Sequence, residues 1–269
     1  MKRARVFLAL SPFALALLAL RMGSARAQGA ARAEGPRPTS AVRLATLAER
    51  VAKLDAQIGQ GILVERSRRG MAEAMRDFEA THRELLAAAG TAPEVRESLR
   101  LLGLLWQEYR AAAARPATRD NARRLGERAE EVVWVAMKAA RLLHDAPRAA
   151  SGTLAMKAAE ACTLSQRIPR LHIWRRWGIR DEGLANELRL SEAQLHATLA
   201  SLRAVSTNTP EITAELQTAA SQAAFLAQAS KELEGGRQAA LHLEFVAKTG
   251  DHILETMERV TRLYEGLSS

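Results

Sequence analysis

Two arginines lie 117 positions apart, each one residue before an apolar position of a helical stripe: Arg50 precedes Val51, and Arg167 precedes Ile168. A guanidinium group stays charged at any relevant pH and offers a planar fork of donors, which suits a planar oxyanion. One hypothesis is that the helices carrying these residues face each other and bring Arg50, Arg167 and also Arg43 around one small anion. The alternative is that each arginine borders a seam between helices, with its stem packed and its head in a salt bridge or in water.

The other residue types that carry chemistry lack the spacing that catalysis or metal binding needs. The six histidines show no H-E-x-x-H pattern, and the sequence has no C-x-x-C-H haem attachment motif. No nucleophile-and-base motif and no phosphate-binding glycine loop is found either. We therefore predict a protein that is not an enzyme and has no cofactor and no metal. The single Cys162 is expected to be a buried thiol, with an intermolecular disulfide as the alternative.

A basic and aromatic segment begins at Arg167. It comprises Arg167, Arg170, His172, Trp174, Arg175, Arg176 and Trp177. This composition suits a membrane surface or an acidic partner. The alternative is that the two tryptophans, three residues apart, both pack on a neighbouring helix. Pro169 within the segment predicts a kink or a late helix start.

The chain repeats itself with a period of 117 residues and without a gap. The matching positions include apolar residues, a glycine break and a helix start. The pairs are Leu47 and Leu164, Arg50 and Arg167, Leu54 and Leu171, Gly61 and Gly178, Ile62 and Ile179, Pro93 and Pro210, and Glu94 and Glu211. A repeat of this length indicates one supersecondary unit used twice.

The elements that must position these residues are predicted to be helices throughout. Beyond residue 40 the chain is rich in Ala, Leu, Arg and Glu and has almost no β-branched runs. Apolar residues recur at intervals of three and four. Such stripes are Leu44, Leu47, Val51, Leu54 and Ile58; Val95, Leu99, Leu102, Trp106 and Tyr109; and Ile253, Met257, Val260 and Tyr264.

Turn and cap signals divide each copy into four helices. Thr91 and Asn208 are expected to cap the third helix of each copy, with Pro and Glu in its first turn. Helices of this length joined by short turns favour antiparallel neighbours. We predict an all-α fold with two tandem up-and-down four-helix bundle modules after a signal peptide. The boundaries are residues 1–27 for the signal peptide, 28–40 for a flexible leader, 41–147 for module 1 and 153–269 for module 2.

The beginning of the chain has the features of a secretory signal. Lys2, Arg3 and Arg5 precede an apolar run, and Ala25-Arg26-Ala27 forms a cleavage motif. The run is about 15 residues long, which is short for a membrane anchor. We expect cleavage near Ala27, a periplasmic or secreted protein, and no transmembrane helix after cleavage.

Most of the positive charge belongs to that signal. Residues 1–27 hold five basic and no acidic residues, so their removal lowers the formal net charge from +9 to +4. The remaining excess is small and scattered, so no nucleic-acid partner is predicted.

The second copy carries Leu164-Ser165-Gln166-Arg167-Ile168, then Leu171 and Trp177-Gly178-Ile179. This resembles the opening helix of the NarX-like sensor domain, also called the type IV pilus methyl-accepting chemotaxis transducer (PilJ-type) N-terminal domain, whose signature runs approximately A-G-R-Q-R-M-L-S-Q-R. The first copy, over residues 47–54, is a looser match. The resemblance covers nearly all of residues 41–269 as a tandem pair. It implies a periplasmic helical bundle that senses a small ligand, nitrate or nitrite in the best-known members, held by arginines of the opening helices.

The chain departs from that signature at the ligand positions. The family's two arginines before L-S-Q-R fall on Glu160 and Cys162 in the second copy, and on Arg43 and Ala45 in the first. From the resemblance we still expect a sensor-like protein that binds a small ligand, such as an anion, and reports to an envelope or membrane signalling protein. The alternative is a structural or adaptor protein of the cell envelope without a small-molecule ligand. A sensor predicts an arginine-lined pocket between the opening helices, whereas an adaptor predicts a filled seam and an exposed face for a partner.

Overall fold

The computed structural model describes residues 36–90, 92–145, 152–179, 183–232 and 239–267. These residues form eight helices: α1 (Pro38–Gly59), α2 (Val64–Ala88), α3 (Pro93–Ala113), α4 (Arg119–His144), α5 (Thr153–Trp177), α6 (Leu184–Arg203), α7 (Pro210–Glu232) and α8 (Ala239–Leu267). No strand occurs within the described ranges, so the predicted all-α fold is confirmed. The predicted signal peptide, residues 1–27, lies outside the described residues.

The first helix begins earlier than expected. α1 starts at Pro38, inside the stretch 28–40 predicted as a leader, with Pro in its first turn. Thr39 is buried and its hydroxyl donates to the carboxylate of Glu265 on α8. Tertiary contacts therefore hold a turn that local composition alone does not favour.

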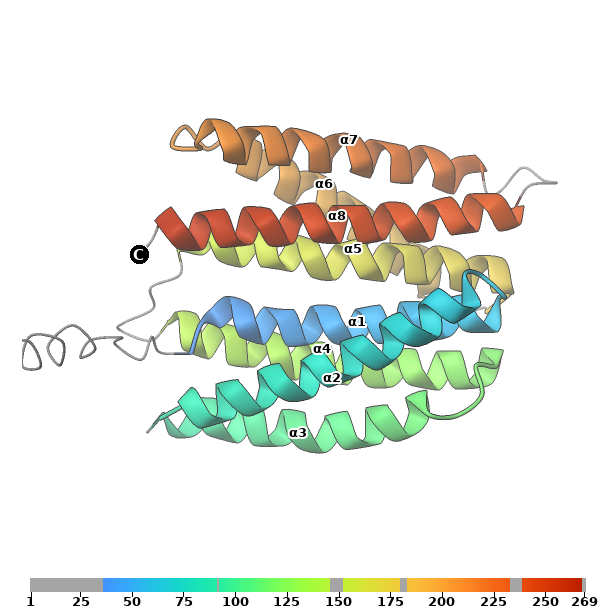
Figure 1. The fold of residues 1–269 in the computed structure, drawn as a ribbon, viewed down its shortest axis with the longest axis horizontal. Coiled ribbons are helices and arrows are strands. Elements are labelled where there is room, and N and C mark those ends of the chain that lie inside the picture. The colour runs from blue at the N-terminus through green and yellow to red at the C-terminus, as the bar shows by residue number, and fades with distance from the viewer. Residues whose placement is uncertain (1–35, 91, 146–151, 180–182, 233–238, 268–269) are drawn as a thin grey trace, which may run out of the picture. The chain divides into compact units, whose positions relative to one another are not determined.

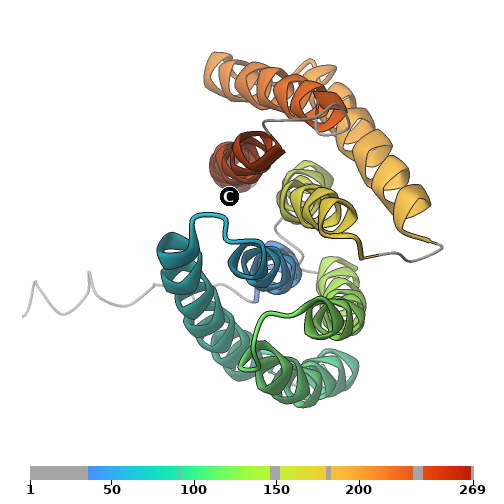
Figure 2. The ribbon, with the colours of Figure 1, turned by 90° about the vertical axis from the view of Figure 1, so that its right-hand side faces the viewer.

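α1 and α5 lie side by side at the centre of residues 36–269, with the other helices around them (Figures 1 and 2). α1 also packs on α2 and α4, and α3 packs on α4; α5 packs on α6 and α8, and α7 packs on α8. One hydrophobic cluster comes mostly from α1 to α4 and a second mostly from α5 to α8. Residues 36–269 form one compact unit. The division of this unit into modules 41–147 and 153–269 stays a prediction.

The two central helices are buried on all sides. Most residues of α1 between Ala41 and Gln57, and of α5 between Ala155 and Trp174, are buried, whereas α2 buries a single stripe. The prediction of one apolar stripe for the opening helix of the first copy was therefore incomplete. Each central helix packs on helices of its own copy and also on the other central helix. Its polar side chains are therefore buried as well as its apolar ones.

The two copies bury side chains in the same register. The buried positions of α2 and α6 match at a spacing of 117, and Gly61 and Gly178 both adopt positive φ, 71° and 78°. The matching buried pairs are Ser67 and Leu184, Met71 and Leu188, Ala74 and Ser191, Phe78 and Leu195, and Leu85 and Leu202. The register of the sequence repeat therefore holds in three dimensions over these helices.

The third helices begin at Pro93 and Pro210, but the expected cap of α7 is displaced by one residue. Thr209 Oγ1 accepts the Ile212 backbone N–H at 3.2 Å. Asn208 instead accepts a hydrogen bond from the Tyr264 hydroxyl at 2.7 Å. The other predicted cap, Thr91, lies outside the described residues.

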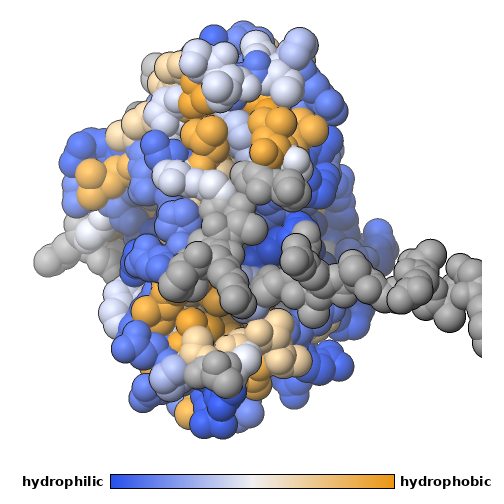
Figure 3. Space-filling model, turned by 90° about the vertical axis from the view of Figure 1, so that its left-hand side faces the viewer, coloured by the Kyte–Doolittle hydropathy of each residue, from blue (hydrophilic) through white to orange (hydrophobic). Residues whose placement is uncertain are grey.

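The surface at the end where α8 finishes is largely hydrophilic, and its apolar side chains gather in separate patches (Figure 3). None of the helices in the described ranges combines the length and the apolar character that crossing a bilayer requires.

Candidate functional site

The opening helices of the two copies face each other, as hypothesised. Thr46 Oγ1 on α1 lies 2.9 Å from Thr163 Oγ1 on α5, and these two residues are 117 positions apart. Matching residues therefore meet at the contact between the central helices. The seam separates the candidate arginines, however: Arg167 lies toward α4 and α6, and Arg50 toward α2 and α8. The structure does not gather Arg43, Arg50 and Arg167 around one point.

Arg167 lies in a group of charges that we call the Glu49 cluster: Glu49, Glu130, Arg167, Arg170 and Glu187. Glu49 Oε1 accepts a hydrogen bond from Arg167 Nε at 2.7 Å, and Glu49 Oε2 lies 3.0 Å from Arg170 Nε. Glu130 accepts from Arg167 at 3.1 Å and from Arg170 at 3.0 Å. Glu187 lies 3.3 Å from Arg170. Two guanidinium groups face three carboxylates, so no positive charge remains here for an added anion.

Glu49 is charged although it is fully buried. Burial opposes its ionisation, but Arg167 and Arg170 outweigh burial and hold the pKa of this carboxyl below its usual value. The Glu49 carboxylate in turn raises the pKa of the Arg167 guanidinium. On this side of the seam the protein's own carboxylate occupies the place between the two arginines.

Arg170 is held against an aromatic ring. Its guanidinium carbon lies 4.5 Å from the centroid of the Trp174 ring, and that ring packs against Gly126 on α4. A side chain at position 126 would displace the ring and with it the support of Arg170.

We predict that Gly126→Ala lowers the free energy of unfolding by about 1–3 kcal/mol, because the added Cβ overpacks this contact. That Cβ would collide with the Trp174 ring and lie 2.8 Å from Arg170 Nη1. The matched control is Gly266→Ala, where a Cβ meets nothing within 4 Å. Helix propensity predicts a gain of up to about 1 kcal/mol for the control. Urea unfolding measures both, and equal free energies for the two variants would contradict the packing described.

On the other side of the seam lies the counterpart, which we call the Arg50 cluster: Arg50, Lys53, Arg66, Gln166 and Asp251. In the register of 117, Arg50 matches Arg167, Lys53 matches Arg170, and Gln166 matches Glu49. Lys53 Nζ lies 2.5 Å from Asp251 Oδ1, and Arg50 and Arg66 both act electrostatically on this pair. Three cations, of which Arg66 is exposed, therefore act on one carboxylate, and a neutral amide occupies the register position that holds Glu49 in the other cluster.

Arg50 retains an unused donor. Within the described part of the chain its Nε is buried and has no hydrogen-bond partner. Lys53 is fully buried; burial lowers the pKa of its ammonium group, and Asp251 offsets only part of that effect. Gln166 Nε2 donates to Ser165 Oγ at 3.2 Å and to the Gly250 carbonyl at 3.1 Å. This cluster therefore offers positive charge and a free N–H to an anion.

The third candidate, Arg43, is paired with acidic side chains. Its guanidinium lies 3.1 Å from Glu258 and 3.3 Å from Asp77. It borders a cavity of about 190 Å³ that Cys162 also lines. Cys162 is buried, which confirms the prediction, and burial raises the pKa of its thiol.

The motif Leu164, Ser165, Gln166 and Arg167 supplies four different contacts. Leu164 belongs to the second hydrophobic cluster, and Ser165 Oγ donates to the Cys162 carbonyl at 2.7 Å. Gln166 and Arg167 take part in the two charge clusters on either side of the seam. Within the motif, Arg167 therefore links α5 to α1, and Gln166 links α5 to α8.

The basic and aromatic segment 167–177 is divided between core and surface. α5 runs through Pro169, so the helix has no late start. Trp174 is buried and half-buried Trp177 packs against Gly59, as the second interpretation of these tryptophans expects. Arg175 and Arg176 are exposed.

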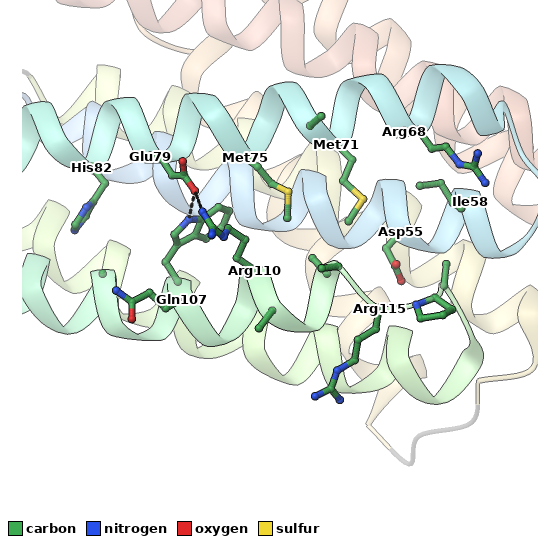
Figure 4. Close-up of a pocket in the computed structure, with 18 residues that line it drawn as sticks. Asp55, Ile58, Arg68, Met71, Met75, Glu79, His82, Gln107, Arg110 and Arg115 are labelled. Atoms are coloured by element: carbon green, nitrogen blue, oxygen red, sulfur yellow. Dashed lines mark hydrogen bonds and ion pairs between the residues drawn. The ribbon is translucent and has the colours of Figure 1, made fainter.

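A groove of about 1210 Å³ lies between α2 and α3 (Figure 4). Its apolar lining includes Ile58 from α1, Met71 and Met75 from α2, and Trp106 from α3. The volume exceeds that of common small-molecule sites, which measure about 300–1,000 Å³. The groove therefore has room for an organic ligand.

Asp55 of α1 lines this groove as an isolated acid. It is 1% exposed, and its Oδ2 has no hydrogen-bond partner among the residues described. Burial raises the pKa of the Asp55 carboxyl to about 7. Asp55 is thus a buried group at the groove that no charged side chain compensates.

Sequence reasoning missed Glu49, Lys53 and Asp55, because all three lie outside the apolar stripe that predicts the buried face of this helix. Comparing the two copies position by position carries a signal that finds Glu49 and Asp55, but not Lys53, which matches the equally basic Arg170. Glu49 exchanges with Gln166, and Asp55 exchanges with His172. Such exchanges of charge at one register position mark places where the copies have diverged in polarity.

Comparison of the chain with models of protein families, with curated proteins and with solved structures finds no match. The resemblance to the NarX-like domain stays a prediction. Among the described residues, no group of three or more His, Cys, Asp or Glu side chains is placed to hold a metal ion.

Proposed function

We propose that this protein is a non-enzymatic, sensor-like protein that binds a small oxyanion, such as nitrate or nitrite, at the Arg50 cluster. The observation that carries the proposal is the excess of three cations over one carboxylate, with Arg50 Nε unused. In the matching Glu49 cluster a carboxylate fills the place between two basic side chains. A bound oxyanion would pair with Arg50 and Lys53 through charge-assisted hydrogen bonds, as the Glu49 carboxylate pairs with Arg167 and Arg170.

The setting of this function is part of the same proposal. Export by the signal at residues 1–27 would place the protein in the periplasm or outside the cell, where small anions are accessible. Because α1 touches both α5 and the first copy's own helices, a ligand at Arg50 would bear on the packing of both copies. An envelope or membrane signalling protein that contacts either copy would respond to this change in packing.

Titration calorimetry with nitrate and with nitrite tests the proposal. We expect a saturable heat with at least one of them and, for Arg50→Ala, a loss of affinity of about tenfold or more, because a charge-assisted hydrogen bond is removed. The matched control is Arg100→Ala, an exposed arginine of α3 outside the cluster, whose affinity should equal that of the unaltered protein. No heat with either anion, or an affinity that Arg50→Ala leaves unchanged, would overturn the proposal.

The second candidate function is that of an adaptor or structural protein of the cell envelope. It is favoured by the filled seam beside Glu49 and by exposed apolar side chains at a groove of about 400 Å³ between α7 and α8. Phe225 and Leu241 there are 62% and 61% exposed. Absence of anion binding, together with unchanged stability in nitrate and nitrite, would favour this candidate.

A further inference from the structure

The two copies differ at one more matched pair, and the difference concerns the groove between α2 and α3. Asp55 of α1 matches His172 of α5, and Met75 of α2 matches Glu192 of α6. In the second copy the two matched side chains contact each other, with His172 Nε2 3.0 Å from Glu192 Oε1. In the first copy the acid lies on the central helix, and the facing position holds a thioether, which cannot compensate its charge.

Asp55 and His172 are both buried, and Asp55 also lines the groove between α2 and α3. α2 crosses obliquely in front of α1 and α3 (Figure 1), and Met71, Met75 and Asp55 lie around the same end of the groove (Figure 4). Apolar side chains thus line a space with one uncompensated acid at its edge. This combination of an apolar wall and a single polar anchor is common in sites for small organic molecules.

We infer that the groove between α2 and α3 binds an organic ammonium ion, whose charged group pairs with Asp55 and whose apolar body packs against Met71, Met75 and Trp106. The ligand's cation would supply the partner that Asp55 lacks. Methionine side chains adapt to ligands of different shape. This site is separate from the Arg50 cluster and does not depend on anion binding there.

Basic side chains also border the groove, but they are engaged or directed elsewhere. Arg110 lies 2.9 Å from Glu79, and Arg68 lies 3.4 Å from Glu65. Arg115 points away from Asp55 (Figure 4).

His82, the remaining titratable group of the lining, hydrogen-bonds the Leu99 carbonyl at 2.7 Å. Asp55 is therefore the lining acid that lacks a partner. A cation beside Met71 and Met75 would have this acid as its partner, since Glu79, the other acid of the lining, pairs with Arg110.

Three probes of equal chain length test the charge preference: hexylammonium, 1-hexanol and hexanoate, titrated into the protein at pH 8. We expect hexylammonium to bind about tenfold or more tightly than 1-hexanol, since a buried ion pair is added to the same apolar contact. Hexanoate should bind most weakly. Equal affinity for hexylammonium and 1-hexanol, tighter binding of hexanoate, or no binding of hexylammonium would overturn the inference.

Variants locate the site. Asp55→Asn should remove the preference for hexylammonium over 1-hexanol while leaving 1-hexanol binding in place. The double variant Asp55→His with Met75→Glu rebuilds the matched pair of the second copy and should abolish hexylammonium binding in a folded protein. The matched control is Asp77→Asn, an exposed acid outside the groove lining, which should bind as the unaltered protein does. Retention of the preference in Asp55→Asn would overturn the assignment to Asp55.

The pH profile gives a further readout. Because Asp55 must be ionised to pair with a cation, and burial raises the pKa of its carboxyl to about 7, hexylammonium should bind about tenfold or more tightly at pH 8 than at pH 5.5. Binding of 1-hexanol should not change over this range. A flat profile for hexylammonium would contradict the pairing with Asp55.

Discussion

Glu49→Gln should destabilise the protein by about 3–5 kcal/mol at neutral pH, because it leaves two arginines at a buried seam without the carboxylate between them. Glu49 is fully buried, and its two oxygens lie 2.7 Å from Arg167 Nε and 3.0 Å from Arg170 Nε. The amide of glutamine keeps the shape of the side chain and removes its charge. Urea unfolding at pH 7 measures the change.

The control for Glu49→Gln is Glu131→Gln, which removes an exposed carboxylate that pairs with Arg128 at 3.0 Å. An exposed pair of this kind is expected to contribute less than about 1 kcal/mol. Adding Arg170→Met to Glu49→Gln should recover about 1 kcal/mol or more, because it removes a buried guanidinium that has lost its buried partner and keeps only the more exposed Glu130 and Glu187. A Glu49→Gln protein as stable as the control would show that the cluster does not hold the seam.

The stabilisation by Glu49 should also depend on pH. Since its pKa is lowered in the folded protein, the stabilisation is present above the ordinary pKa of a glutamate. It is lost as the pH falls toward the lowered value. The difference between Glu49→Gln and the unaltered protein should therefore shrink on acidification.

Asp55→Asn is expected to stabilise the protein, and increasingly so as the pH rises. Burial raises the pKa of Asp55 from 3.8 to about 7, so the folded protein holds a proton that the unfolded chain has released. Stability therefore falls as the pH rises from about 4 to about 7 and then levels off. At pH 8 the gain from Asp55→Asn should reach at most about 4 kcal/mol, and at pH 4 it should be close to zero.

Thermal or urea unfolding at pH 4, 5, 6, 7 and 8 measures this slope, with Asp77→Asn as the control. Asp77 is exposed, so its substitution should leave the pH dependence of the unaltered protein in place. A gain from Asp55→Asn that is the same at every pH would contradict the raised pKa and the isolation of this carboxyl.

The helices and their apolar stripes could be predicted because their spacing is a local property. Val95, Leu99, Leu102, Trp106 and Tyr109 are all buried along one side of α3, as expected. The same holds for the stripe of α8. The first residue of α1 could not be predicted, because the turn at Pro38 is held by a contact with α8, more than 200 positions away.

The site was harder to predict because the central helices bury their polar residues as well. In a helix with one covered face, Glu49, Lys53 and Asp55 would lie in water. In α1 they are buried, since α5 covers a further side of the helix. Their partners come from helices remote in sequence, as Asp251 does for Lys53. The exchange of Glu49 for Gln166 is visible in the repeat, but its meaning depends on knowing that both residues lie at the seam.

Nitrite titration of the unaltered protein and of Gln166→Glu tests the central claim most directly. The substitution places a carboxylate at the position that matches Glu49, without removing any basic side chain. We predict a saturable heat for the unaltered protein and none for Gln166→Glu, with the variant still folded by circular dichroism. If both proteins bind nitrite equally, or if the unaltered protein binds neither nitrite nor nitrate, the Arg50 cluster is not a site for these anions.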